Sequence, residues 1–158
     1  MPEVTAPQLV TILRGKSLRN RTAVLLLPPS WFGREREIAT RLGISFKDER
    51  DMLLSNLAPG QRYLGQTWRD LIAQQMDDLD RGSRPDGDCV LVANVDILLS
   101  SFLAADRRHF WAFLREACKP SWGLLLVLPN ETRRVMTPAE RSDWASDGRL
   151  GVWAEGDM

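Results

Sequence analysis

Three short runs of almost unbroken apolar residues divide the chain. They are Ala23–Leu27, Cys89–Val95 and Leu124–Leu128. None of them alternates polar with apolar positions, as a strand with one solvated face would. Continuous apolar runs of this length are typical of strands buried on both faces of a parallel sheet. The pattern therefore predicts three central strands, with helices covering both sides.

The segments between these runs have the apolar spacing of amphipathic helices. The spacing predicts helices near residues 6–14, 33–42, 47–57, 67–81 and 107–118. Short strands are expected at residues 44–46 and within 148–155, a turn at 58–60 and a loop at 81–87. Strands that alternate with helices predict a three-layer α/β sandwich with a mostly parallel sheet. A chain of 158 residues without a linker or repeat predicts a single domain over residues 1–158.

Composition adds few constraints to this picture. Apolar residues make up 44% of the chain and charged residues 27%, which is a globular balance. No apolar run reaches the length of a membrane span, and the N-terminus lacks the features of a secretory signal, so we expect a cytoplasmic protein with no membrane partner. The two cysteines, Cys89 and Cys118, are expected to be buried thiols rather than a disulfide.

The loop after the first strand has the layout of a phosphate-binding P-loop with altered residues. A P-loop has the form G-x-x-x-x-G-K-[ST] between a strand and a helix, and its amides, lysine and hydroxyl hold phosphate and Mg²⁺. Here Pro28 takes the first glycine position and Gly33 the second, Arg34 takes the lysine position, and Glu35 the hydroxyl position. Proline has no N–H to donate, and a carboxylate repels phosphate. The same residues also suit an ordinary strand-to-helix connection, so this loop alone is a weak signal.

The ends of the other two strands carry the remaining candidates for a nucleotide site. A Walker B strand ends in an acid that holds Mg²⁺, but the second apolar run offers Ala93 at that position, followed by Asn94 and Asp96. Asp96 is either an acid of the site or a cap of the following helix. Asn130, after the third run, is either a phosphate-sensing side chain or part of a Pro-Asn turn. These positions predict a P-loop NTPase-like fold with degenerate motifs.

The chain resembles the BrxF family, the small P-loop proteins of type III bacteriophage-exclusion (BREX) defence systems. The resemblance rests on the strand and loop described above and on two short segments. Val92-Ala93-Asn94-Val95-Asp96-Ile97-Leu98 is similar to the Walker B segment L-L-D-N-I-E-I-L of that family. Gly148-Arg149-Leu150 with Trp153-Ala154-Glu155 is similar to its G-R-L-x-Y-A-E tail. The resemblance implies a role in bacterial anti-phage defence, inside a larger complex.

Together, the altered loop and the resemblance predict an accessory or adaptor subunit that does not hydrolyse ATP. We expect no cofactor and no catalytic residue, and we expect association with other proteins of the same system or with a second copy. The alternative is a weak ATP- and Mg²⁺-binding subunit that a partner completes. The chain has six tryptophans, and Trp31, Trp144 and Trp153 fall outside the clear core pattern. At least one of these three lies at a protein interface, where exposed tryptophan is favoured, or all three pack in the ordinary way.

A third possibility is a DNA-binding accessory protein. Arg14, Lys16, Arg19 and Arg21 form a basic group before the first strand and are its candidate phosphate contacts. The whole chain has 21 basic and 21 acidic residues, which argues against strong non-specific binding to DNA.

The remaining polar residues are weaker candidates. The single histidine, His109, and two distant cysteines do not supply a usual zinc ligand set, so no metal site is expected. Arg107 and Arg108 are expected at the start of a helix, either as a solvated helix end or as groups that reach a neighbouring subunit.

Overall fold

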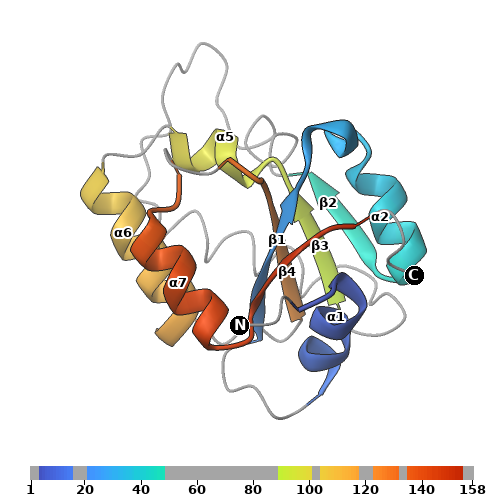
Figure 1. Cartoon of the computed structure of the whole chain (residues 1–158), viewed down its shortest axis with the longest axis horizontal. Helices are drawn as coiled ribbons and strands as arrows, with labels where there is room; N and C mark the ends of the chain where they lie inside the picture. The colour runs from blue at the N-terminus through green and yellow to red at the C-terminus, as the bar shows by residue number, and fades with distance from the viewer. Residues whose placement is uncertain are drawn as a thin grey trace, which may run out of the picture.

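The computed structural model describes residues 4–15, 21–48, 89–100, 104–117, 123–131 and 135–154. The predicted helix 67–81, the turn at 58–60 and the loop at 81–87 lie outside these residues, as does most of the predicted helix 47–57. Figure 1 shows the described elements as strands running side by side with helices to either side of them.

The sheet has five described strands, all parallel, in the order β2-β3-β4-β1-β5. Their bounds are β1 (Thr22–Leu27), β2 (Ser45–Asp48), β3 (Cys89–Ala93), β4 (Gly123–Pro129) and β5 (Leu150–Val152). The three predicted apolar runs therefore share one sheet, and the short C-terminal strand lies at its edge, as predicted. Every residue of β1 and β3 is buried, which explains why neither strand alternates polar with apolar residues.

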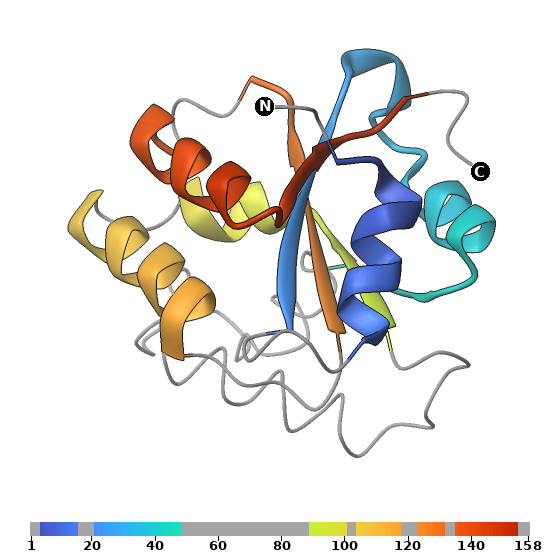
Figure 2. The same cartoon turned by 60° about the horizontal axis from the view of Figure 1, so that its bottom comes forward.

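Helices cover both faces of this sheet, which confirms the three-layer α/β sandwich. On one face lie α1 (Ala6–Arg14) and α2 (Glu35–Leu42), and on the other lie α5 (Val95–Ser100), α6 (Ala104–Ala112) and α7 (Pro138–Ser146). Side chains alternate along β1, so Leu25 packs toward the first layer and Leu26 toward the second. Figure 2 shows the sheet nearly edge-on between the two layers. None of the described helices is long and apolar enough to cross a membrane.

Local signals in the sequence explain where two of these helices begin and end. Thr5 caps α1 and forms a capping box with Gln8, which confirms the predicted first helix. Helix α2 ends at Gly43, whose φ of +68° is the left-handed conformation that favours glycine. It begins at Glu35, two residues after the predicted start, because Gly33 has a φ of +84° and is not helical.

Two helix predictions were wrong in detail. Residues 47 and 48 belong to β2 rather than to a helix, since Lys47 pairs with Val92 along the edge of β3. Helix α6 begins at Ala104, so Arg107 and Arg108 lie inside it and not at its start. Its continuation, Phe113–Ala117, is π-helical.

A buried arginine ties several elements together at the amino edge of the sheet. Arg149 is 5% exposed and precedes β5. Its Nε donates to the Thr22 carbonyl at 2.7 Å, Nη1 donates to the Arg115 carbonyl at 3.0 Å, and Nη2 donates to the Thr22 hydroxyl. The hydroxyl of Thr22 donates in turn to the Leu114 carbonyl at 2.7 Å. Carbonyls at the end of a helix carry partial negative charge and have no partner within the helix, so they suit a cation.

An acidic residue and an indole ring complete the surroundings of Arg149. Asp147 lies 3.6 Å from its Nη1, and the guanidinium stands 4.4 Å from the ring centroid of Trp144. Asp147 also accepts from Nε of Arg115 at 2.7 Å, and this hydrogen bond raises the pKa of the Arg115 guanidinium. The Arg149 network thus joins β1, the π-helical segment after α6, and the connection from α7 to β5.

We predict that Arg149→Met lowers the free energy of unfolding by about 3 kcal/mol, because buried carbonyls lose their donors. For a domain of this size the melting temperature should fall by roughly 6–12 °C. Thermal unfolding followed by circular dichroism measures the change. Arg108→Met, at an exposed position on α6, is the matched control and should change stability by less than about 0.5 kcal/mol. Equal stability of both variants would contradict the role of Arg149.

Of the two possibilities for Trp31, Trp144 and Trp153, a protein interface or ordinary packing, the structure shows packing in the interior for all three. Each of them is at most 3% exposed, and Trp111 is buried as well. Trp31 packs edge-on against Trp153, with 5.3 Å between the ring centroids, and Trp111 packs edge-on against Trp144, with 5.8 Å between the centroids. One ring pair packs in each of the two helical layers. The sequence did not indicate this burial, because Trp31, Trp144 and Trp153 do not follow a regular helical pattern of apolar residues.

The two buried indoles Trp111 and Trp153 differ in one respect. Nε1 of Trp111 donates to the Val135 carbonyl at 2.6 Å, whereas Nε1 of Trp153 has no hydrogen-bond partner among the described residues. We therefore predict that Trp111→Phe destabilises the protein by about 1 kcal/mol more than Trp153→Phe, since only the first substitution removes a buried hydrogen bond. Urea unfolding of the two variants measures this difference. A larger loss for Trp153→Phe would refute it.

Candidate functional site

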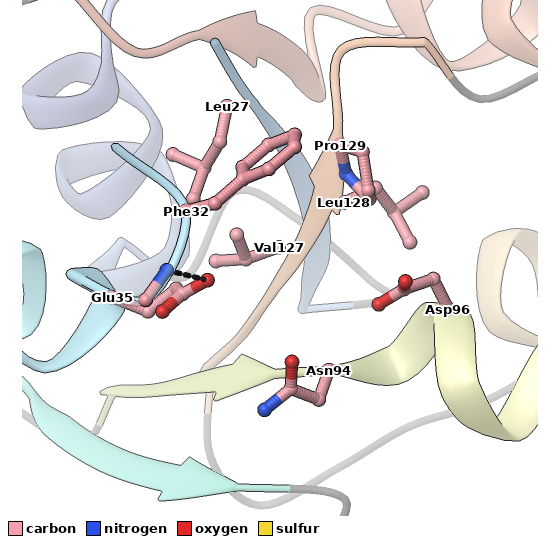
Figure 3. Close-up of a pocket in the computed structure, with 9 residues that line it drawn as sticks. Leu27, Phe32, Glu35, Asn94, Asp96, Val127, Leu128 and Pro129 are labelled. Carbon is pink, nitrogen blue, oxygen red and sulfur yellow. Dashed lines mark hydrogen bonds between the residues drawn. The ribbon is translucent and has the colours of Figure 1, made fainter. Parts of the chain in front are cut away.

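A pocket of about 220 Å³ opens where the carboxyl ends of β1, β3 and β4 meet. Ligands of open parallel sheets bind outside this edge of the strands. Its lining comes from the loop after β1, the segment after β3 and the end of β4: Leu27, Phe32, Gly33, Glu35, Asn94, Asp96, Val127, Leu128 and Pro129. Figure 3 shows Glu35 and Asp96 approaching this space from opposite sides, with Phe32 above and Asn94 below. Of the predicted nucleotide-site residues, Gly33, Glu35, Asn94 and Asp96 meet here.

The loop after β1 is closed upon itself and does not cradle a phosphate. The Trp31 amide donates to the Pro28 carbonyl at 3.0 Å, the Phe32 amide to the Pro29 carbonyl at 3.2 Å, and the Arg34 amide to the Trp31 carbonyl at 3.0 Å. Pro29–Trp31 form a 3-10 turn. A P-loop surrounds phosphate with free N–H groups, whereas here the amides of Trp31, Phe32 and Arg34 are bonded within the loop.

Glu35 occupies the place where a phosphate would meet the helix. Its carboxylate accepts from the Gly33 amide at 3.3 Å, and Glu35 is the first residue of α2. The N-terminus of a helix attracts negative charge, and here a side chain of the protein supplies it. The carboxylate therefore takes over one contact that a P-loop reserves for its ligand.

Arg34 does not contribute to the pocket. Its guanidinium pairs with Glu37 at 3.0 Å and stands 3.9 Å from the ring centroid of Trp31. Pro28 lies at the base of the 3-10 turn and does not line the pocket either. The one basic residue that the sequence places at the phosphate loop is thus held against an aromatic ring.

The end of β3 provides an amide and a carboxylate, but no strand acid. Ala93 is fully buried at the last position of β3 and has no group that could hold a metal. Asn94 follows with a φ of +62°, and its amide nitrogen donates to the Asp48 carboxylate at 2.9 Å. Asp96 lies in the first turn of α5 and lines the pocket. The sequence analysis did not identify Asp48 as a candidate. Its position at the end of β2, opposite Ala93 in the neighbouring strand β3, places it beside Asn94.

Asn130 turns away from the pocket toward α7. Arg141 donates to its backbone carbonyl and to its side-chain oxygen, each at 3.2 Å. The Asn130 amide donates to the Leu27 carbonyl at 2.8 Å, which continues the pairing of β4 with β1. Asn130 thus connects the sheet to α7, and it is not among the residues that line the pocket.

The described members of the basic group before β1 have structural partners. Arg14 donates to the Gly43 carbonyl at 3.0 Å, and Arg21 donates to the Leu13 carbonyl at 2.9 Å. Both carbonyls lie at helix ends, where a cation is favourable. Lys16 and Arg19 lie outside the described residues. Within the described part of the chain, no group of His, Cys, Asp and Glu could hold a metal ion.

Comparison with known proteins adds no relative to this picture. No family model matches the chain, no curated protein matches it, and no solved structure matches it.

Asn94 contributes to stability through its hydrogen bond to Asp48 and through its tolerance of a positive φ, and two substitutions test these contributions separately. We predict that Asn94→Gly costs about 1 kcal/mol of stability, because it removes the bond to Asp48 and keeps a residue that accepts positive φ. Asn94→Ala should cost about 1 kcal/mol more, because alanine is strained in this conformation. Urea unfolding of both variants gives the comparison. If alanine were tolerated as well as glycine, the left-handed backbone at this position would be wrong.

Proposed function

We propose that this protein is a non-hydrolysing accessory or adaptor subunit with a P-loop-like layout. The observation that carries the proposal is the contact between the Glu35 carboxylate and the Gly33 amide, at the position that a nucleotide phosphate would need. A γ-phosphate brought to this loop would meet a fixed negative charge and amides that already have acceptors. Binding would have to break those bonds without a lysine to compensate.

The surroundings of the pocket also disfavour Mg²⁺-dependent chemistry on a nucleotide. In P-loop enzymes a hydroxyl of the loop and an acid at the end of a strand hold the metal, which bridges the phosphates. This chain has Glu35 and Ala93 at those positions, and Arg34 is turned onto Trp31. With both positions changed, this chain supplies neither of the usual protein ligands of Mg²⁺, and a neighbouring subunit would have to provide both.

The sheet arrangement supports the P-loop-like part of the proposal. A P-loop site requires that a phosphate loop, a strand-end acid position and a third strand end converge at one edge. Here β4 lies between β1 and β3, and the ends of all three strands reach one pocket. The setting in bacterial anti-phage defence, within a cytoplasmic complex, rests on the resemblance to BrxF proteins.

We predict that millimolar ATP with Mg²⁺ leaves the melting temperature of the purified protein unchanged and that no hydrolysis above background occurs. A ligand at about 100 times its Kd would add about 2.7 kcal/mol, which corresponds to roughly 5–10 °C for a domain of this size. Thermal unfolding with and without nucleotide, together with a phosphate-release assay, measures both effects.

Arg34→Ala is the matched variant for this experiment. Arg34 contacts Glu37 and Trp31 rather than the pocket. The variant, like the parent protein, should therefore show no change in melting temperature when ATP is added. A clear thermal shift with ATP in the parent protein that disappears in Arg34→Ala would show a working phosphate site. That result would contradict the proposed function.

A further inference from the structure

The polar side chains that line the pocket at the carboxyl edge of the sheet all present hydrogen-bond acceptors. Glu35 and Asp96 contribute carboxylates. The amide nitrogen of Asn94 is bonded to Asp48, so its carbonyl oxygen is the atom that remains for a ligand. Figure 3 shows this oxygen on the side of Glu35 and Asp96, with the nitrogen turned away from them. A ligand of this pocket must therefore bring donors and positive charge.

The rest of the lining is apolar and includes an unusual exposed ring. Leu27, Val127, Leu128 and Pro129 form apolar walls. Phe32 is 49% exposed and is the one large hydrophobic side chain that is exposed among the described residues. Figure 3 shows its ring beside Leu27, near the carboxyl ends of the paired strands β1 and β4. An aromatic ring next to acceptors suits a planar cation, which can stack on the ring while its edges donate.

Among the residues that the structure describes, no arginine or lysine lines the pocket beside Glu35 and Asp96. Arg34 and Arg41 both pair with Glu37, and Arg36 stands over the ring of Phe46. None of these arginines lines the pocket. Glu35 and Asp96 therefore face an opening without a cation of the described chain beside them.

We propose that this pocket receives an arginine side chain of a partner protein. The proposal rests on the proposed adaptor function and names the chemistry by which the adaptor holds its partner. A guanidinium carries several N–H donors in a rigid planar fork, has no acceptor, and ends an apolar stem. It can donate to Glu35, Asp96 and the Asn94 oxygen while it stacks on Phe32. The volume of about 220 Å³ is smaller than the roughly 300–1,000 Å³ of sites for drug-sized ligands, and it suits a single side chain.

Arginine fits this pocket better than lysine or a metal ion. Lysine is a compact, strongly hydrated point charge that cannot donate along several fixed directions at once. A hard divalent ion prefers six or more oxygen ligands and has no use for apolar walls. Arginine is also enriched at the energetic centres of protein interfaces, where it pairs with desolvated acceptors.

The test uses a capped tripeptide, acetyl-Gly-Arg-Gly-amide, titrated into the full-length ¹⁵N-labelled protein. We expect saturable shifts of the backbone amide signals of Gly33, Glu35 and Asp96, with a dissociation constant on the order of 1 mM for one side chain. Asp96→Asn and Glu35→Gln should each weaken binding roughly fivefold to tenfold, since each removes one charge-assisted hydrogen bond. Both substitutions keep an acceptor oxygen and nearly the same shape.

Three controls make the result decisive. Glu116→Gln removes a carboxylate at the end of the π-helical segment, outside the pocket, and should bind like the parent protein. The peptide with citrulline in place of arginine keeps the shape without the charge and should not bind. Phe32→Ala should weaken binding by a smaller factor than Asp96→Asn.

Several outcomes would overturn the proposal. They are the absence of saturable shifts, unchanged binding by Asp96→Asn, and equal binding of the citrulline peptide or of the same peptide with lysine in place of arginine. Displacement of the peptide by millimolar Mg²⁺, with the same amide signals shifting, would assign the pocket to a metal ion instead. Failure of the arginine peptide would leave the ATP experiments untouched, so a non-hydrolysing adaptor could hold its partner elsewhere. ATP binding would refute the adaptor function whether or not the peptide binds.

Discussion

Arg149 places a positive charge in the interior, and the surrounding elements are arranged to satisfy it. Its donors reach backbone carbonyls of β1 and of the segment after α6, and Asp147 lies beside it. A buried charge is costly unless it is paired and fully hydrogen-bonded. Arg149 immediately precedes β5, which pairs with β1. Gly151 of β5 lies against the Val4 carbonyl, where a Cβ would clash. The Arg149 network thus lies next to the place where both ends of the described chain join the sheet.

The two edges of the sheet differ in chemistry. At the amino edge, cations are bonded to carbonyls at the ends of helices, as Arg149 and Arg21 are. At the carboxyl edge, the first turns of α2 and α5 carry Glu35 and Asp96. Helix N-termini attract anions, and in most nucleotide-binding sheets the ligand provides them. Here the protein provides its own carboxylates at the N-termini of α2 and α5. The pocket between them therefore presents negative charge to solvent.

This reversal of charge gives the proposed adaptor a specific way to recognise a partner. The pocket at the carboxyl edge of the sheet offers two carboxylates and an amide oxygen, which are the acceptors that a cationic side chain needs. The exposed ring of Phe32 adds an apolar contact at its rim. The buried tryptophans, by contrast, stabilise the two helical layers and are unavailable to a partner.

The sequence by itself determined the features that depend on neighbouring residues. Unbroken apolar runs specified the central strands, Thr5 and Gly43 mark helix ends, and Pro28 and Ala93 stand where a P-loop pattern has glycine and an acid. Only the tertiary structure decided which distant groups meet. It buried Trp31 against Trp153, turned Asn130 toward Arg141, bonded Asn94 to Asp48, and enclosed Arg149. Local patterns report periodicity and backbone preference, whereas the partner of a buried polar group depends on the strand order and on the packing of the helical layers.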